Sequence, residues 1–295
     1  MIFINNYEFS AKVKNIAKNC NTLYVLGCPG APLNAANRRR YTQNYSYNRR
    51  QNRVDKIISS SSDVFGFDDA FLIKSVLWGW TGNKKDNYGG AKYESNGVPD
   101  IGADAMIKRC IDVSANFNKI DIGEIIWRQG HVGVYIGNGL AVECSSRWAD
   151  KVQITGVSNI SENRAYNNRE WVKHGKLPYI NYISADEHLN HLAREVINGK
   201  WGFGDETKKK IADAGYSYDD VINRANEILV SIRILVGDIY GNKKIASSDA
   251  RLILRAALSD DTLYSIQNAV SDDDNNKKIT IALARTILQK AVGFS

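Results

Sequence analysis

The sequence VFGFDDAFLIKSVLWGW, residues 64 to 80, predicts a buried helix with an acidic start. Apolar side chains surround nearly its whole circumference, which is typical of a helix enclosed by protein; they are Phe71, Leu72, Ile73, Val76, Leu77 and Trp78. Asp68 and Asp69 stand at the N-terminus of this helix. The helix dipole and the unpaired N–H groups there favour a carboxylate or a thiolate, so the position suits either a helix cap or an activated nucleophile.

This stretch resembles the catalytic motif of NlpC-type cell-wall cysteine peptidases, in the subgroup found in phage endolysins of Gram-positive hosts. In that motif an aromatic residue, an aspartate and the nucleophilic cysteine begin the buried helix. Phe67 and Asp68 match it, and Asp69 occupies the position of the nucleophile. The run from Tyr24 to Gly27 resembles the Tyr-x-x-Gly that precedes the nucleophile, which implies that Tyr24 lines the site. Taken alone, a tyrosine in an apolar run is more often a core residue.

Residues 130 to 145 form two alternating runs joined at Gly-Asn-Gly, a pattern that predicts a β-hairpin. A three-residue loop, residues 137 to 139, with Gly139 in a left-handed bulge gathers the apolar side chains on one face: Val132, Val134, Ile136, Leu140, Val142 and Cys144. His131 and Glu143 then share the other face, where the carboxylate would hold the imidazole tautomer and support its protonated form. The hairpin resembles the His-containing strand pair of the NlpC-type peptidases, which implies His131 as the base and Glu143 as the third polar residue.

The resemblance implies a papain-like α+β domain over residues 1 to 182, and three interpretations of its site remain open. A peptidase or amidase with an altered nucleophile could use the neighbouring thiol of Cys28, whose other interpretation is a buried apolar residue. Alternatively, the domain is a pseudoenzyme that still binds muropeptide. A carboxylate at the nucleophile position attacks amides far less readily than a thiolate and would give an anhydride. Asp69, His131 and Glu143 could instead hold a divalent metal.

Residues 38 to 53, RRRYTQNYSYNRRQNR, interleave arginine with tyrosine. Such a pattern can stack on bases and contact phosphates, but we expect a solvated, irregular loop and no nucleic acid partner. The formal charge of +7 and the pI near 9.1 suit nucleic acid, anionic membranes and the phosphate-rich walls of Gram-positive bacteria alike.

Residues 187 to 230 predict three short amphipathic helices, with Asp205 capping the second. The segments LAREVINGKWGFGD and AGYSYDDVINRANEIL resemble the cell-wall-binding repeat of the CW-seven type. This resemblance implies a three-helix bundle over residues 186 to 232 that binds muropeptide. Four aromatic residues would stack on sugar faces or close the small core: Trp201, Phe203, Tyr216 and Tyr218.

Residues 236 to 295 contain two loop-and-helix repeats and resemble a type I dockerin, an all-α helical pair whose loops bind calcium. The oxygen ligands that the two loops offer are Asp238, Asn242 and Asp249, then Asp272, Asp274 and Asn276. Tyr240 and Leu283 stand where such loops need an oxygen ligand. We therefore expect weak Ca²⁺ binding at most, no other cofactor, and use as a spacer, a self-association element or a partner-docking module.

The four cysteines are too few and too irregular for a disulfide framework or a zinc site. The N-terminal residues lack the unbroken apolar core of a secretory signal, and no stretch is long enough to span a bilayer. We expect synthesis in the cytoplasm, no membrane partner and action at the wall. The expected function is binding of Gram-positive peptidoglycan and hydrolysis of its amide bonds, with a catalytically inactive peptidoglycan binder as the alternative.

Overall fold

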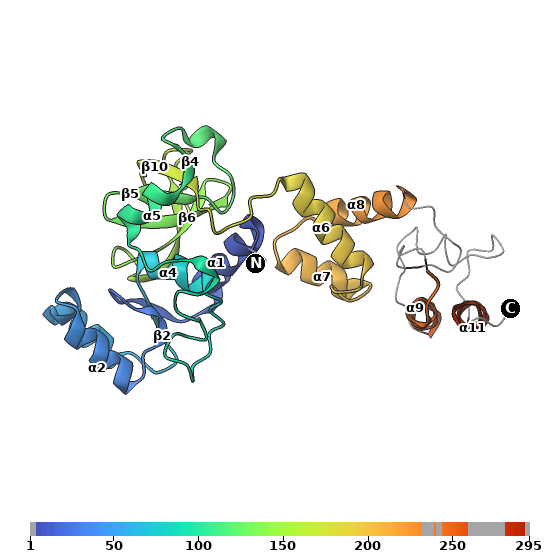
Figure 1. Ribbon diagram of the computed structural model, residues 1–295, viewed down its shortest axis with the longest axis horizontal. Coiled ribbons are helices and arrows are strands. Elements are labelled where there is room, and N and C mark those ends of the chain that lie inside the picture. The colour runs from blue at the N-terminus through green and yellow to red at the C-terminus, as the bar shows by residue number, and fades with distance from the viewer. Residues whose placement is uncertain (1–3, 232–238, 240–243, 259–280, 293–295) are drawn as a thin grey trace. The chain divides into compact units, whose positions relative to one another are not determined.

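The computed structural model describes residues 4–231, 239, 244–258 and 281–292. They form a mixed α+β structure, as the sequence predicts, within two compact units, Met1–Ile183 and Ser184–Ser295 (Figure 1). None of the helices in these ranges is long and apolar enough to cross a bilayer.

The first unit is built around a seven-stranded sheet with the strand order β4-β10-β5-β6-β7-β8-β9. Its strands are β4 (Ile111–Ser114), β5 (Ile125–Arg128), β6 (His131–Gly137), β7 (Leu140–Ser145), β8 (Lys151–Val157), β9 (Asn168–Arg169) and β10 (Lys173–Lys176). Neighbouring strands are antiparallel except β8 and β9. A smaller sheet has the order β1-β3-β2 and consists of β1 (Thr22–Tyr24), β2 (Pro29–Pro32) and β3 (Phe65–Phe67).

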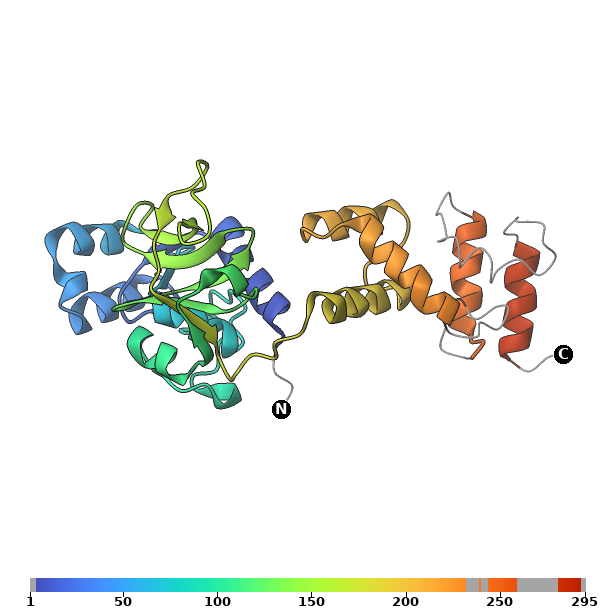
Figure 2. The same cartoon turned by 90° about the horizontal axis from the view of Figure 1, so that it is seen from above.

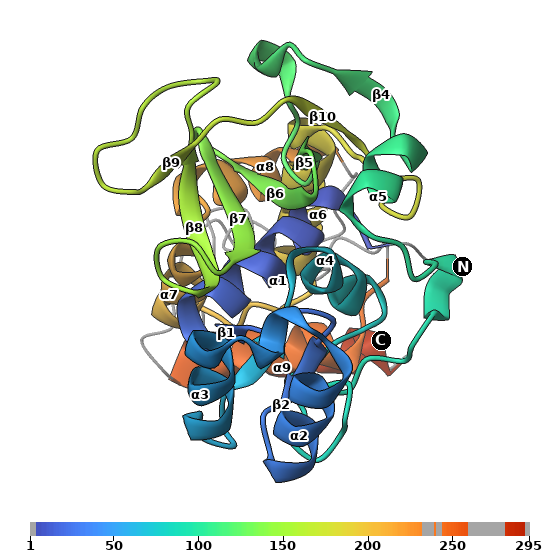
Figure 3. The same ribbon diagram turned by 90° about the vertical axis from the view of Figure 1, so that its left-hand side faces the viewer.

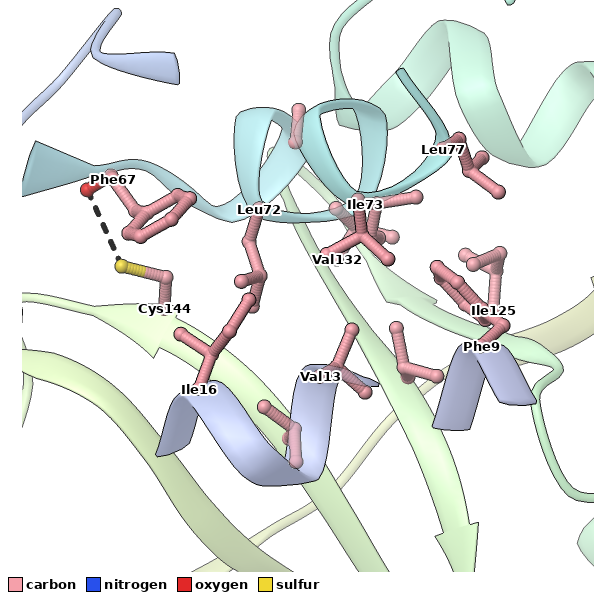
Figure 4. Close-up of a cluster of buried hydrophobic side chains, with 14 of the residues drawn as sticks. Phe9, Val13, Ile16, Phe67, Leu72, Ile73, Leu77, Ile125, Val132 and Cys144 are labelled. Carbon is pink, nitrogen blue, oxygen red and sulfur yellow. Dashed lines mark hydrogen bonds between the residues drawn. The ribbon is translucent and has the colours of Figure 1, made fainter. Parts of the chain in front are cut away.

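Helices α1 (Asn6–Asn19) and α4 (Asp69–Leu77) pack on one face of the large sheet (Figure 4). Their side chains meet the inward residues of the strands in one core, which includes Phe9, Val13, Ile16, Leu72, Ile73, Ile125, Val132 and Cys144. The opposite face of the sheet is covered by a second cluster that includes Trp171 and Phe117. The other short helices of this unit are η2 (Ser95–Gly97), α5 (Ala103–Arg109) and η3 (Phe117–Lys119). Because α4 is enclosed, its N-terminus is held firmly against β6.

The hairpin of β6 and β7 has the predicted register but a different turn. Val134 pairs with Val142 and Gly133 with Glu143, so the apolar residues face α1 and α4. The closing turn has two residues, Asn138 and Gly139, both with positive φ of 54° and 69°. The extra residue lies one step earlier, as a bulge between Tyr135 and Gly137. The bulge restores the register that an unbulged two-residue turn would have reversed.

Residues 35 to 59, here called the insert, are helical, so the prediction of an irregular loop was wrong. The insert forms α2 (Ala35–Asn44), η1 (Tyr47–Arg49) and α3 (Gln51–Ser59). Asn34 caps α2 by accepting the N–H of Asn37. Tertiary contacts override the polar composition, because the buried amide of Asn48 bonds both the N–H and the carbonyl of Leu26. The spacing of apolar residues by three and four positions that normally marks a helix is nearly absent from α2.

The second unit begins with the three predicted helices, α6 (Ala185–Ile197), α7 (Asp205–Asp213) and α8 (Tyr218–Ser231). Ser184 and Glu187 form a capping box at the start of α6. The prediction that Asp205 caps α7 was wrong by one residue, since Gly204 is the N-cap and Asp205 lies in the first turn. Further on, α9 (Ser247–Leu258) and α11 (Ile281–Ala291) lie side by side around a core that includes Ile253 and Ile287 (Figure 2).

Candidate functional site

The start of α4 is fixed by the carboxylate of Asp68. One oxygen accepts the N–H of Phe71 at 2.7 Å, as an N-cap, and the other accepts the N–H of Gly27 at 2.8 Å. Burial, together with the neighbouring carboxylate of Asp69, raises the pKa of Asp68 to about 7. Asp68 therefore joins the run from Tyr24 to Gly27 to the helix start, with a backbone N–H bonded to each of its two oxygens.

Gly27 is required where this run meets the insert. Its φ is +76°, and a Cβ there would lie 1.9 Å from the ring of Tyr45. The Tyr45 ring therefore packs directly on the backbone beside Asp68.

Tyr24 lies beside the same residues because β1 runs parallel to β3 and pairs Tyr24 with Phe67. Its ring meets that of Tyr47 edge-on, with centroids 5.9 Å apart. Burial raises the pKa of the Tyr24 phenol, and the nearby carboxylates of Asp69 and Asp68 raise it further. Tyr24 is therefore a neutral, half-buried hydrogen-bonding group next to the start of α4.

The structure brings Asp69, His131 and Glu143 into direct contact. His131, the first residue of β6, places Nδ1 2.9 Å from Oδ2 of Asp69 and Nε2 2.8 Å from Oε2 of Glu143. The same Asp69 oxygen also accepts the N–H of Val132 at 3.1 Å. The imidazole is thus held between two carboxylates, and only 16% of its side chain is exposed.

Both ring nitrogens of His131 face acceptors, which favours the doubly protonated imidazolium. Burial alone would lower the pKa of His131, but the hydrogen bonds to Asp69 and Glu143 outweigh it and raise the pKa. Burial would raise the pKa of Glu143, yet its bonds to His131 and Arg169 hold it below its usual range. The resting site is therefore a carboxylate–imidazolium–carboxylate array.

Three supporting residues were not identified from the sequence. Thr155 and Arg169 each bond Oε1 of Glu143, at 2.9 and 2.8 Å, and Glu143 is fully buried. Trp171 stacks on His131, with ring centroids 5.4 Å apart and planes 14° apart. No local pattern marks these partners, because Thr155 and Arg169 lie on β8 and β9 and reach Glu143 through sheet pairing. The one chemical signal in the sequence was that Glu143, if buried, would need a positively charged partner such as Arg169.

A cleft of about 460 Å³ opens beside Asp69. The start of α4 forms one wall of the cleft, and Tyr45 of the insert and Ala103–Ala105 of α5 form others. Asp104 lies at this edge and accepts the N–H of Gly130 at 2.8 Å and the indole N–H of Trp127 at 2.9 Å. The residue before His131 is thereby tied to α5.

Two of the open chemical interpretations do not fit this geometry. The ring nitrogens of His131 point to different carboxylates, so the three side chains do not converge on one ion, and no set of metal-binding side chains occurs in the described part of the chain. Cys28 is fully buried, and burial raises the pKa of its thiol to about 12. It cannot supply a thiolate at neutral pH.

The predicted calcium ligands Asp238, Asn242, Asp272 and Asp274 lie outside the described residues, as does Asn276. Asp249 is described and buried, and it accepts the N–H of Ile239 and of Ala246, both at 2.8 Å. Asp249 therefore supports the start of α9.

The aromatic residues of the second unit are half-buried rather than enclosed. Trp201, Tyr216 and Tyr218 pack against the core of α6, α7 and α8. The indole N–H of Trp201 donates to Glu195 at 3.1 Å. Phe203 packs instead toward the core of α9 and α11 and lies 4.9 Å beneath the guanidinium of Arg255.

Residues 190–229 match the CW_7 repeat. This is a cell-wall-binding repeat, and its match confirms the resemblance seen over residues 187 to 230. No curated protein and no solved structure matches the chain. The CW_7 repeat includes most of α6, the whole of α7 and most of α8, together with the three aromatic residues that border their core.

Proposed function

We propose that this protein binds bacterial peptidoglycan through the CW_7 repeat. The match of residues 190–229 carries this proposal. The half-buried rings of Trp201, Tyr216 and Tyr218 support it, because aromatic faces at the rim of a small core can stack on sugars while the bundle stays closed.

For the first unit, residues 1 to 182, we propose an NlpC-like domain that binds muropeptide and lacks thiol chemistry. Asp69 begins a helix packed on the sheet and lies 2.9 Å from Nδ1 of His131, whose Nε2 lies 2.8 Å from Glu143. A carboxylate beside an imidazolium has the same charges as the thiolate–imidazolium pair of a cysteine peptidase. The site would thus keep the electrostatic field of such an enzyme without its nucleophile.

Hydrolysis of a muropeptide amide is a second candidate. The His131–Glu143 pair and the open cleft beside Asp69 favour it. An imidazolium with both nitrogens engaged cannot accept a proton in the first step, however, and attack by Asp69 would give an anhydride. The binding function therefore fits the geometry better.

We further propose that residues 186–232 act as the wall anchor and residues 236–295 as a dockerin-like segment. The latter would serve as a spacer or a docking module and would bind Ca²⁺ weakly at most. Its two repeat helices, α9 and α11, share one core, which supports a paired-helix module. Synthesis in the cytoplasm and action at the Gram-positive wall complete the proposal.

Catalysis is tested with purified Gram-positive sacculi incubated with the unchanged protein, with His131→Ala, with Asp69→Cys, and with Asp69→Cys combined with His131→Ala. Mass spectrometry follows released amino termini. We expect release by Asp69→Cys alone, since a thiol at this position would lie against the imidazole that Glu143 orients. Release by the unchanged protein, lost in His131→Ala, would favour the hydrolase instead.

Wall binding is tested by cosedimentation of the full chain with the same sacculi. Trp201→Ala should weaken binding, whereas the control Tyr166→Ala removes a partly exposed ring from the first unit and should not. Thermal unfolding of each variant checks that the second unit still folds. Equal binding by all three proteins would remove the support for the CW_7 repeat as the anchor.

A further inference from the structure

Most of the net positive charge of this chain lies in the insert. Residues 35 to 59 contain seven arginine or lysine residues and one acid, Asp55, whereas the whole chain has a formal net charge of +7. The insert, which consists of α2, η1 and α3, thus accounts for nearly the whole net positive charge of the chain. Figure 3 shows α2 and α3 together, on the side of the first unit away from β4 and β10.

The insert is anchored by only part of this charge. Arg53 is buried and bonds Asp150 at 2.6 Å as well as the carbonyl of Tyr24, and Lys56 reaches the same carboxylate at 2.9 Å. Arg38 donates to the carbonyls of Ile58 and Ser60 at the end of α3. These contacts hold α2 and α3 against the rest of the unit, so the insert presents a fixed surface.

Four arginines of the insert remain exposed, and we call them the arginine face: Arg39, Arg40, Arg49 and Arg50. Within the described ranges, no carboxylate lies at ion-pair distance from any of the four. These arginines contact neutral groups, such as the carbonyl of Gln43 for Arg49 and the ring of Tyr47 for Arg50. Exposed cations without counter-charges attract a polyanion.

The tyrosines that alternate with these arginines are buried or half-buried. Tyr41 is buried in a core with Cys28 and Ile57, Tyr45 packs on Gly27, and Tyr47 meets Tyr24 edge-on. Binding of single-stranded nucleic acid depends on exposed rings on which bases stack. Because the tyrosine rings of the insert are engaged in these contacts, the arginine face can contact phosphates but offers little surface on which bases could stack.

We propose that the arginine face binds the linear polyol-phosphate polymer of the Gram-positive wall. Such a chain carries one negative charge per repeat and has no bases, so it needs only the guanidinium–phosphate contacts that this surface offers. The inference rests on the proposed action at the wall. Because Tyr45 belongs both to the insert and to the lining of the cleft, a polymer held there would lie next to the muropeptide site.

The test measures binding of labelled poly(glycerol phosphate) by the full chain at several salt concentrations. One variant combines Arg39→Gln, Arg40→Gln, Arg49→Gln and Arg50→Gln. The control combines Lys84→Gln, Lys85→Gln, Lys119→Gln and Lys173→Gln, which removes the same charge from exposed sites elsewhere in the first unit. A third protein carries lysine at the four arginine positions, which keeps the charge.

We expect the unchanged protein to bind the polymer with a steep salt dependence. Four phosphate contacts correspond to a roughly 50-fold loss of affinity between about 50 and 200 mM salt, if the polymer behaves as a single nucleic acid strand does. The arginine-to-glutamine variant should lose most of this binding. The control should change it less than twofold, and the lysine variant should retain it.

Three results would overturn the proposal: no polymer binding at low salt, equal losses in the variant and the control, or tighter binding of single-stranded DNA with the same number of phosphates. Cosedimentation with sacculi freed of phosphate polymer reports on peptidoglycan binding without any contribution from the polymer. That measurement should be unaffected by the arginine substitutions, so a failure of this inference is distinguishable from a failure of the proposed wall binding.

Discussion

Replacing Asp69 by asparagine should lower the pKa of His131 by about one unit. The substitution keeps the shape of the side chain and removes one of the two anions that contact the imidazolium, at 2.9 Å. A hydrogen bond to a charged group is worth about 1.5–3 kcal/mol and a neutral one about 0.5–1.5 kcal/mol. The difference of about 1–1.5 kcal/mol corresponds to about one pKa unit, at roughly 1.36 kcal/mol per unit.

The same substitution should make stability less dependent on pH. Because the contacts with Asp69 and Glu143 raise the pKa of folded His131, they stabilise the fold fully below the unfolded value, near ~6.5. This stabilisation is lost as the pH rises through the folded value. Asp69→Asn should therefore cost about 1–1.5 kcal/mol near pH ~6 and clearly less near pH ~9.

Two measurements check this prediction. NMR titration follows the His131 ring signal, assigned by its loss in His131→Ala, and urea unfolding at both pH values gives the stabilities. Asp55→Asn is the control, since it removes an exposed carboxylate that contacts only Gln51 in its hydrogen bonds. An unchanged pKa of His131, or equal destabilisation at the two pH values, would refute the imidazolium assignment.

Three further substitutions test the surrounding structure. Glu143→Gln should destabilise the fold by about 3–5 kcal/mol in urea unfolding, because it leaves buried Arg169 without its anion. Asp68→Asn should flatten the pH dependence of stability between pH ~4 and ~7, since the pKa of buried Asp68 is raised to about 7 and the folded state holds this proton longer than the unfolded chain. Gly133→Ala should cost about 1–3 kcal/mol and alter tryptophan fluorescence, because its Cβ would lie 3.0 Å from both Trp171 and a Val142 carbonyl.

Hydrophobic patterns over short stretches of sequence predicted the helix and the hairpin that carry the site. The all-round apolar sequence of residues 64 to 80 indicated an enclosed helix, and α4 is one. Alternation in residues 130 to 145 indicated which face of the hairpin is buried, and this brought His131 and Glu143 together. Both signals arise from side chains a few residues apart.

The insert and the support of Glu143 depend on distant partners, so the sequence did not reveal them. Asn48 bonds Leu26 and Arg53 bonds Asp150, and these contacts stabilise helices in a polar stretch. The spacing of residues in the sequence does not predict such contacts. Arg169 reaches Glu143 only because β9 pairs with β8, which in turn pairs with β7. Strand β9 has only two residues, which is too short to show the alternation that predicts a strand.

The bulge before Gly137 controls chemistry at the far end of its strand. A hairpin of the same residues, closed by the same two-residue turn but without the bulge, would pair Val134 with Glu143. His131 and Glu143 would then face opposite sides of the sheet. Deleting Gly137 together with the bulge would instead leave Val134 opposite Val142 and keep both side chains on one face. One backbone irregularity, at the end of β6 remote from the cleft, therefore sets which residues of the hairpin share a face.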